Sequence, residues 1–335
     1  MFEDKKILIT GGTGSLGTAL TKYLLKTNVN TIRIFSRDEL KQVQMQHDVT
    51  DKRLRFLIGD IRDKERLSRA LEDIDIVFHA AAMKQVPIAE YNPFEAVKTN
   101  VLGAQNVIES CLDNEVEFAL AIGTDKAVSP LNTYGATKLL MERMFTAANF
   151  YKGTHKTKFV CVRYGNVLGS RGSVLPKFIE QSKKGKQITI TDQNMTRFNI
   201  TMRQAVELVF RAVKYGSPGE IFVPKLKSYR VGDLKDAIIE LLNVKVNVKK
   251  IPIRPGEKFH EVLINKDEIA YTFESRDDYV IRSPGVDELQ IKTKTHLRKV
   301  EFTDTYSSDK VELLTKQEIK KIIQQEQILS QIGSF

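Results

Sequence analysis

Near its start the chain runs directly from a short apolar stretch through a glycine-rich turn into an amphipathic helix. Residues 6–10 read KILIT, which is typical of a buried strand, and residues 17–27 (GTALTKYLLKT) have helical spacing. The turn within ITGGTGSLG places Gly11, Gly14 and Gly17 at intervals of three residues. Glycines so placed let the backbone approach a pyrophosphate at a helix N-terminus. The stretch therefore predicts the first unit of a dinucleotide-binding fold.

The same strand-then-helix order continues through the first half of the chain. Further strands are expected at TIRIFS (31–36), LRFLIG (54–59), DIVFHAA (75–81), EFALAIGT (117–124) and KFVCVRYGN (158–166). Helical patterns lie between them, including DKERLSRALED (63–73) and a long segment over residues 92–113. This alternation predicts an α/β fold with a Rossmann-type doubly wound parallel sheet, and ligands are expected at the carboxyl ends of its strands.

After Asn166 the elements become shorter and mixed. A helix is expected late in residues 169–185, a strand at 186–192, helices over 201–216 and 228–243, and an extended segment over 248–258. We expect a dinucleotide-binding domain at 1–166, completed by parts of 198–224. A smaller, discontinuous mixed α/β substrate-binding lobe is expected at 167–285, and a tail at 286–335. The tail has apolar residues at helical spacing and is expected to pack on the body or on a neighbouring subunit: Leu314, Ile319, Ile322, Ile323 and Ile328.

Composition narrows the function classes. The chain is 41% hydrophobic and 28% charged, as in ordinary globular proteins. Its formal charge of +10 comes from basic residues interleaved with acidic ones, which favours a solvated surface over a nucleic-acid site. No apolar run is long enough for a bilayer and the start lacks a signal-peptide layout, so we expect a cytoplasmic protein with no membrane partner. Cys111 and Cys161 are expected to have structural roles. The five histidines show no metal-ligand spacing, so no metal site is expected.

The end of the second expected strand bears on the choice of dinucleotide. Ser36 and Arg37 stand where an acidic residue usually binds a ribose 2′-hydroxyl, and an arginine can instead pair with a 2′-phosphate. This favours NADP. Asp38 follows directly, which leaves NAD open. The other residues expected to contact the cofactor are Gly11, Thr13, Gly14, Ser15, Leu16, Gly17, Asp60, Ile61, Ala80, Ala81, Ala82, Lys84, Asn100, Tyr134, Lys138 and Tyr164.

The stretch GTDKAVSPLNTYGATK carries the expected chemistry. Tyr134 and Lys138 are four residues apart and share a helix face. The charge of the lysine, with that of an oxidised nicotinamide, would lower the pKa of the tyrosine enough for it to act as a base, and Thr124 can share the substrate proton. Asp125 and Lys126 place an acid beside an amine. The alternatives are a helix that merely contains Tyr and Lys, and a surface ion pair.

Several long motifs together resemble a known family. They are AAMKQVPIAEYNPFEAVKTNV, GTDKAVSPLNTYGATK, RYGNVLGSRGSVLPKF, ITITDQNMTRF and RPGEKFHE, in this order. The chain resembles the extended short-chain dehydrogenase/reductases that act on nucleotide sugars. Within them it is similar to the inverting UDP-N-acetylglucosamine 4,6-dehydratases of polysaccharide, flagellin-glycan and capsule pathways. The tail from about Asp287 also resembles the C-terminal segment of the capsule enzymes.

The resemblance implies a reaction in which C4 is oxidised, water is eliminated across C5 and C6, and hydride returns to C6. Tyr134 would serve the oxidation. Asp125, kept partly protonated, would be the acid for the C6 hydroxyl, and Lys126, kept neutral, the base at C5. Which of the two is acid and which is base stays open.

The resemblance also implies a set of residues for the UDP-N-acetylglucosamine substrate. The segment around MKQVP would surround the sugar and Asn166 would lie at the sugar–diphosphate junction, while cations would bind the diphosphate and uridine. Each of these charges could instead be an exposed surface group. The expected substrate residues are Lys84, Val86, Asn166, Lys177, Arg197, Arg254, Glu257 and Lys258.

Other functions remain open from the sequence alone. A nucleotide-sugar 4-epimerase or a retaining dehydratase would share the fold, although the adjacent Asp125 and Lys126 argue against both. A non-catalytic dinucleotide sensor is a third possibility, but such a protein would not need Tyr134, Lys138 and the acid–amine pair. A homo-oligomer is expected in each case.

Overall fold

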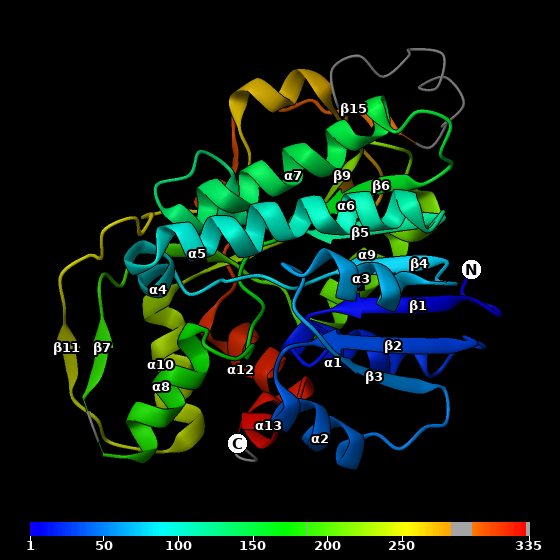
Figure 1. Ribbon diagram of the computed structural model, residues 1–335. Coiled ribbons are helices and arrows are strands. Elements are labelled where there is room, and N and C mark those ends of the chain that lie inside the picture. The colour runs from blue at the N-terminus through cyan, green and yellow to red at the C-terminus, as the bar shows by residue number, and fades with distance from the viewer. Residues whose placement is uncertain (186, 283–296, 333–335) are drawn as a thin grey trace.

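A large, mostly parallel sheet with helices on both faces dominates the computed structural model, which describes residues 1–185, 187–282 and 297–332 (Figure 1). Its parallel strands are β1 (Lys6–Thr10), β2 (Thr31–Ser36), β3 (Leu54–Ile58), β4 (Ile76–His79), β5 (Phe118–Ile122), β6 (Lys158–Val162) and β9 (Ile221–Pro224). Their spatial order is β3-β2-β1-β4-β5-β6-β9. The strand order reverses between β1 and β4, so the loops that follow these two strands diverge and leave a crevice at the carboxyl edge of the sheet.

Antiparallel strands extend the sheet beyond β9, and three two-stranded sheets lie beside it, two of them antiparallel and one parallel. The extension consists of β14 (Asp278–Ile281), β13 (Thr272–Glu274) and β15 (Arg298–Lys299). The small sheets pair β8 (Thr196–Phe198) with β10 (Ser228–Arg230), β7 (Ile188–Ile190) with β11 (Val248–Lys250), and β12 (Val262–Ile264) with β16 (Tyr306–Ser307). The β7–β11 pair is the parallel one. The helix expected within residues 228–243, with its start left open between Ser228 and Gly232, begins at Val231, and residues 228–230 form a strand that pairs with β8.

Side chains that alternate along the strands supply two cores, one on each face of the sheet. Leu8 packs with α3 (Lys64–Leu71), α6 (Gly103–Asp113) and α7 (Thr133–Tyr151). Ile7 and Ile9 point the other way and pack with α1 (Ser15–Leu24) and α9 (Met202–Tyr215). The remaining helices on this half are α2 (Glu39–Asp48), α4 (Val86–Tyr91) and α5 (Pro93–Val97). This two-sided burial confirms the doubly wound arrangement that the sequence predicts.

The helix expected over residues 92–113 is interrupted. After α5 a single π-helical segment, η1 (Lys98–Leu102), precedes α6. Such segments put an extra residue into a helix and often lie at functional sites. Here Asn100 in η1 accepts a hydrogen bond from the backbone N–H of Met83 at 2.8 Å and donates one to its carbonyl at 3.0 Å. The irregular helix thereby fixes the loop that follows β4.

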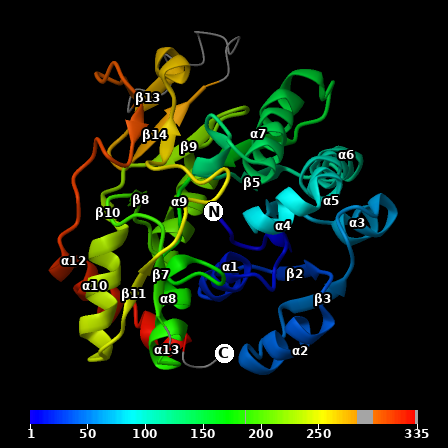
Figure 2. The same cartoon turned by 90° about the vertical axis from the view of Figure 1, so that its left-hand side faces the viewer.

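A third core forms the smaller lobe. It joins α8 (Val174–Lys183), α10 (Val231–Leu242) and the tail helix α12 (Lys316–Gln325), which lie together beside the carboxyl edge of the sheet in Figures 1 and 2. Ile319 and Ile323 of α12 are buried against this lobe, as the apolar spacing of the tail predicts. A short helix, α13 (Ile328–Ile332), follows. The expected boundary between residues 285 and 286 lies outside the described residues.

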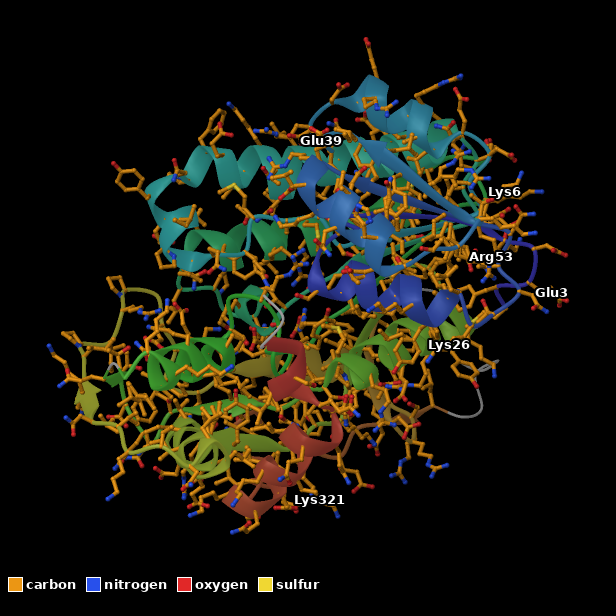
Figure 3. The ribbon with its side chains drawn as sticks, turned by 90° about the horizontal axis from the view of Figure 1, so that it is seen from below. Glu3, Lys6, Lys26, Glu39, Arg53 and Lys321 are labelled. Carbon is orange, nitrogen blue, oxygen red and sulfur yellow. The ribbon has the colours of Figure 1, made fainter. Side chains whose placement is uncertain are left out.

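Charged side chains surround the outline of the molecule, and basic groups often stand beside acidic ones (Figure 3). Lys6 pairs with Asp73, and Arg53 pairs with Asp51 at 2.8 Å. This interleaving agrees with the solvated surface expected from the sequence. Among the residues described, no helix has both the length and the apolar composition needed to span a bilayer.

Candidate functional site

A cavity of about 1180 Å³ lies at the carboxyl edge of the sheet, between the glycine loop and the smaller lobe. It is lined by the turn after β1, the ends of β2 to β5, the start of α7, and the segments around residues 166–178 and 251–261. Every residue expected to bind cofactor or substrate lines it except Asn100, which lies behind the loop that it fixes. Among the expected catalytic residues, Asp125 alone does not line it.

The glycine loop can approach a ligand closely because two of its glycines leave no room for a side chain. Gly11 has φ of 66°, and a Cβ there would lie 2.8 Å from the Cα of Ala81. A Cβ on Gly17 would lie 2.5 Å from the carbonyl oxygen of Gly12. Helix α1 begins at Ser15 with no acidic residue in its first turn, so its unpaired backbone amides can receive an anion. These features fit the pyrophosphate of a dinucleotide.

At the end of β2 the two charged residues differ in what they contact. Asp38 is the N-cap of α2, where its carboxylate accepts from the backbone N–H of Lys41 at 3.0 Å and also pairs with the Lys41 ammonium. Arg37 is 58% exposed and lies 3.5 Å from Asp60. The helix cap therefore occupies the carboxylate, whereas the guanidinium faces the cavity edge.

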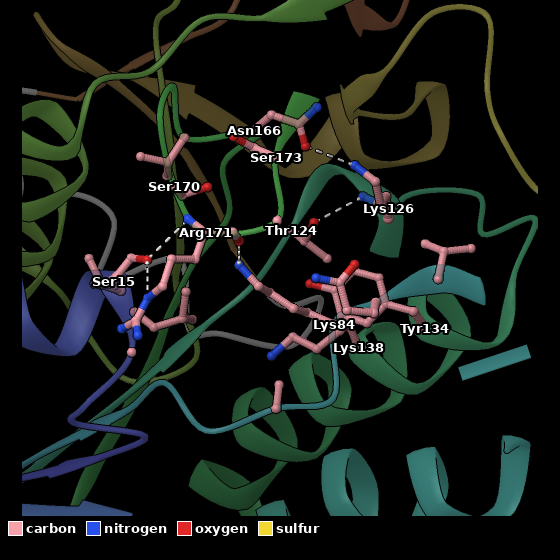
Figure 4. A pocket seen from close by; sticks show the side chains of 18 of the residues that line it. Ser15, Lys84, Thr124, Lys126, Tyr134, Lys138, Asn166, Ser170, Arg171 and Ser173 are labelled. Carbon is pink, nitrogen blue, oxygen red and sulfur yellow. Dashed lines mark hydrogen bonds between the residues drawn. The ribbon is translucent and has the colours of Figure 1, made fainter. Parts of the chain in front are cut away.

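Helix α7 presents Tyr134 and Lys138 toward the cavity (Figure 4). The helix starts there because Asn132 caps it, accepting from the N–H of Gly135 at 2.8 Å. Burial lowers the pKa of Lys138 to about 8. Burial also raises the pKa of Tyr134, an effect that Lys126 and the Thr124 hydroxyl partly offset. In the protein alone the lysine whose charge acts on Tyr134 is Lys126, and the expected joint effect of Lys138 and an oxidised nicotinamide stays a prediction.

Lys126 lies at the centre of a polar cluster. Its Nζ donates to Asp125 Oδ1 at 3.0 Å and to Asn166 Oδ1 at 3.2 Å, and it lies 3.4 Å from Glu261 Oε1 (Figure 4 shows the bond to Asn166). Asp125 is 1% exposed and its Oδ1 also accepts from the Thr124 hydroxyl at 2.9 Å. The acid and the amine are thus neighbours within the site, as the resemblance implies, and the pair is not a surface ion pair.

The charge on Lys126 differs from the expected one. Burial lowers its pKa, but the nearby carboxylates of Asp125 and Glu261 outweigh this effect and raise the pKa above the ordinary value. The protein alone therefore holds Lys126 as an ammonium, and the expectation of a neutral amine is wrong for this state. Since Asp125 Oδ1 is 3.0 Å away, transfer of one proton between the two groups would produce the neutral amine and the protonated acid.

Sequence reasoning missed two residues of the site. Glu261 is 3% exposed and lines the cavity beside Lys126. Arg171, in the segment GSRGS, donates to the carbonyl of Thr13 at 2.5 Å and lies 3.5 Å from the Ser15 hydroxyl. Lys84 in turn donates to the carbonyl of Arg171 at 2.9 Å. The available signals were a basic residue between two glycines for Arg171 and, for Glu261, its place at the end of the motif RPGEKFHE.

The cations on the smaller lobe have distinct surroundings. Burial lowers the pKa of Lys177, and the nearby charge of Arg254 lowers it further, so two cations face the same part of the cavity. This arrangement fits a diphosphate. Arg197 is 6% exposed and donates to the carbonyls of Thr196 at 2.7 Å and Phe259 at 3.0 Å. Much of its donor capacity is therefore used within the protein.

Comparison with known proteins gives the family. The model of the family described as polysaccharide biosynthesis protein matches residues 7–283. The chain belongs to this family. An inverting UDP-N-acetylglucosamine 4,6-dehydratase of Campylobacter jejuni is 50% identical over 288 residues, which are 85% of this chain and 85% of that protein. These matches confirm the resemblance to extended short-chain dehydrogenase/reductases of that group.

Two other relatives carry different descriptions. An uncharacterized membrane protein of Methanocaldococcus jannaschii is 47% identical over 331 residues, 97% of this chain and 96% of that protein. A UDP-glucose 4-epimerase of Rickettsia rickettsii is 40% identical over 328 residues, 96% of each. Among solved structures, Pen from Bacillus thuringiensis is 40% identical, with a TM-score of 0.92 over 98% of this chain and 99% of that one. The last match confirms the fold prediction.

Proposed function

We propose that the protein is an inverting UDP-N-acetylglucosamine 4,6-dehydratase that uses NADP and acts in the biosynthesis of surface polysaccharide or glycan. The observation that carries the proposal is the presence of Tyr134 and the Asp125–Lys126 pair at one cavity, beside a loop that fits a dinucleotide. A site that only transfers hydride needs the tyrosine and no further acid–base pair. The additional acid–amine pair is what an elimination requires. The similarity to the dehydratase of C. jejuni supports the same conclusion.

The residues divide the reaction into two parts. A bound nicotinamide dinucleotide would supply the chemistry of hydride removal from C4 and hydride return to C6. Tyr134 acts as a phenolate, a form that the charges of Lys126 and of an oxidised nicotinamide would favour, and it becomes a neutral phenol when it takes the proton of the 4-hydroxyl. Thr124 orients the hydroxyl, since its own side chain is held by Asp125 at 2.9 Å. Lys138, held behind Tyr134 on α7, orients the cofactor and the tyrosine.

Elimination follows at the Asp125–Lys126 pair. Asp125 takes a proton from the Lys126 ammonium across their 3.0 Å contact, and the amine then removes the proton from C5. The proton held on Asp125 passes by way of the Thr124 hydroxyl to the C6 oxygen, which leaves as water. Removal of the C5 proton restores the Lys126 ammonium, and inversion requires that the new proton reach C5 on the face opposite to Lys126; the proton that Tyr134 took from the 4-hydroxyl balances this addition. The C5 configuration is therefore inverted.

The preference for NADP rests on the end of β2. Asp38, the residue that could bind a ribose hydroxyl, is the cap of α2. Arg37 and Lys41 both line the cavity edge and supply positive charge for a 2′-phosphate. Arg171 links the smaller lobe to the glycine loop through Thr13, which supports a cofactor that is retained between turnovers.

Large apolar side chains are exposed along α4 to α7, including Tyr91 at 88%, Phe94 at 63% and Leu140 at 50%. Their exposure supports a homo-oligomer that covers this surface.

The second candidate function is a 4-epimerase, favoured by the similarity to the epimerase of R. rickettsii. An epimerase would not need the buried contacts that fix Lys126.

One incubation separates these functions. The protein, purified with whatever cofactor it retains, is incubated with UDP-N-acetylglucosamine in deuterated water and without added dinucleotide. We expect a product lighter by one water and carrying deuterium at C5. A product of unchanged mass and altered C4 configuration would establish the epimerase instead. An unchanged substrate, with cofactor bound, would refute both.

A further inference from the structure

Glu261 is a buried carboxylate that the proposed mechanism does not use. It is 3% exposed, its Oε1 lies 3.4 Å from Lys126 Nζ and 3.7 Å from Arg197 Nε, and its Oε2 has no hydrogen-bond partner among the described residues. A buried carboxylate is costly unless it is paired, so its place between two cations calls for a role at this point.

The tail of the chain holds Glu261 in place. The backbone N–H of Glu261 donates to the Ser308 hydroxyl at 2.9 Å, and the N–H of Ser308 donates to the Glu261 carbonyl at 2.8 Å. The Ser308 hydroxyl also lies 2.6 Å from that of Thr196, next to Arg197. Ser308 follows β16, which pairs with β12 directly after Glu261. The tail thus anchors the backbone of a site residue.

The Lys126 ammonium is consequently fixed from three sides. Asp125 comes from η2 (Asp125–Ala127), Asn166 from the segment after β6, and Glu261 from the segment before β12. If only Asp125 held it, the long side chain could rotate about that single contact. Glu261 supplies the opposite contact, which directs the nitrogen toward the cavity.

We propose that Glu261, whose backbone is held by hydrogen bonds to Ser308 of the tail, is a positioning residue. It orients Lys126 for proton removal at C5 and favours the protonated form of this lysine before the reaction. This inference rests on the proposed function. It adds to that function a residue that acts through Lys126, and it gives the tail a part in the active site. The family model ends at residue 283, so Ser308 lies beyond the matched segment.

The pH dependence follows from the groups around Lys126. Asp125 and Glu261 favour its charged form. Arg197 opposes it, and the ammonium of Lys258 stands near enough to interact with it. The side chains of Tyr134 and Tyr229 also face it, and burial raises the pKa of each in the protein alone. The Lys126–Asp125 pair needs one proton, which passes to the C6 oxygen, so water loss should fall at the high pH at which this proton is lost to solvent. Loss of the Glu261 charge lowers the pKa of Lys126, so this fall should move to lower pH.

The test compares the pH dependence of water loss in three variants of the full-length protein. Glu261→Gln keeps the shape and removes the charge. We expect its rate to fall at a pH about 1 unit or more below that at which the parental rate falls, which is the size of effect expected for an opposite charge at this distance, and its maximal rate to be lower. Glu261→Asp keeps the charge, so its curve should stay at the parental pH with a reduced maximum. Ser308→Ala should lower the maximum less than Glu261→Gln does.

A matched control is Glu220→Gln. Glu220 is 1% exposed and pairs with Arg282 at 3.1 Å, remote from the cavity. It should keep the parental pH dependence, because it removes a buried charge without touching Lys126. A Glu261→Gln curve that superimposes on the parent, or that is lowered at every pH without displacement, would overturn the inference.

A second measurement separates this inference from the proposed function. Acetic anhydride reacts with neutral amines, so the labelling of Lys126 at pH 8 to 9, followed by peptide mass spectrometry, reports the neutral fraction without any substrate. We expect about tenfold faster labelling in Glu261→Gln, the change that corresponds to 1 pKa unit. Equal labelling would overturn the inference even if water loss occurs. If the parent loses no water, the proposed function fails and the labelling rates alone decide the role of Glu261.

Discussion

The two walls of the cavity are built in different ways. The sheet wall includes the glycine loop after β1 and Ala80 to Ala82 after β4, where backbone and small side chains line the cavity. The charged wall carries Lys126 of η2, which follows β5, together with Glu261, Arg197, Lys177 and Arg254 from three segments of the smaller lobe. The first wall fits a large rigid ligand by its shape, whereas the second depends on the protonation of a few groups. Binding and chemistry are thus largely assigned to different walls.

This difference predicts how the walls respond to substitution. A change on the sheet wall should alter which cofactor binds, and how tightly, while the chemical steps continue. A change in the charged cluster should leave the cofactor bound and stop a particular step. Tyr134 stands between the walls and should affect both halves of the reaction.

The largest effect is expected for Tyr134→Phe. The ring remains, so the packing of α7 is preserved, but the 4-hydroxyl proton loses its acceptor. We expect cofactor reduction on addition of UDP-N-acetylglucosamine to slow by about two to four powers of ten. Stopped-flow absorbance of the reduced nicotinamide measures it. Phe150→Tyr, on the exposed end of α7, is a control that should react at the parental rate. Rapid reduction in Tyr134→Phe would assign the base elsewhere.

An intermediate effect is expected for Arg37→Ala. Hydrogen bonds to charged groups contribute about 1.5–3 kcal/mol, so NADP affinity should fall by about 10- to 100-fold while NAD affinity changes little. Calorimetric titration of cofactor-free protein measures both. Arg69→Ala removes another exposed arginine, one paired with Glu72, and should change neither affinity. Equal affinities of the parent for the two dinucleotides would contradict the assignment of Arg37.

The smallest effect is expected for Asp38→Ala. Loss of the helix cap should reduce the free energy of unfolding by about 1 kcal/mol. NAD affinity should not change, because the carboxylate is engaged by the Lys41 backbone. Asp63→Ala is a matched control, since Asp63 caps α3 in the same way by accepting from Arg66 at 3.0 Å. Denaturant unfolding and calorimetry check both variants. A large loss of NAD affinity in Asp38→Ala alone would show that this residue binds the ribose.

The sheet wall could be predicted from the sequence because its residues are contiguous. The spacing of Gly11, Gly14 and Gly17, directly after a strand, identifies both the turn and its ligand. The same holds for Tyr134 and Lys138 on one helix. The alternation of the six N-terminal strands with helices likewise predicted a doubly wound parallel sheet.

The charged wall could not be predicted in the same detail, because its properties depend on contacts between distant segments. Nothing local indicates that Glu261 lies 3.4 Å from Lys126, 135 positions earlier in the numbering. Without that contact, burial and nearby positive charge suggested a neutral amine, whereas the carboxylates of Asp125 and Glu261 raise the pKa of Lys126 in the protein alone. The strand at residues 228–230 was missed for a similar reason, since its partner β8 lies about 30 residues earlier.

The most direct test of the account is a comparison of two chemical events in Lys126→Ala. The variant must first be shown to be folded and loaded with cofactor. Tyr134 and the glycine loop remain, so UDP-N-acetylglucosamine should still reduce the bound dinucleotide, whereas elimination has no base. We predict partial accumulation of reduced cofactor, with C5 deuterium exchange and water loss slower than in the parent by about two to four powers of ten. Water loss at the parental rate would show that the Asp125–Lys126 pair is structural and would contradict the mechanism.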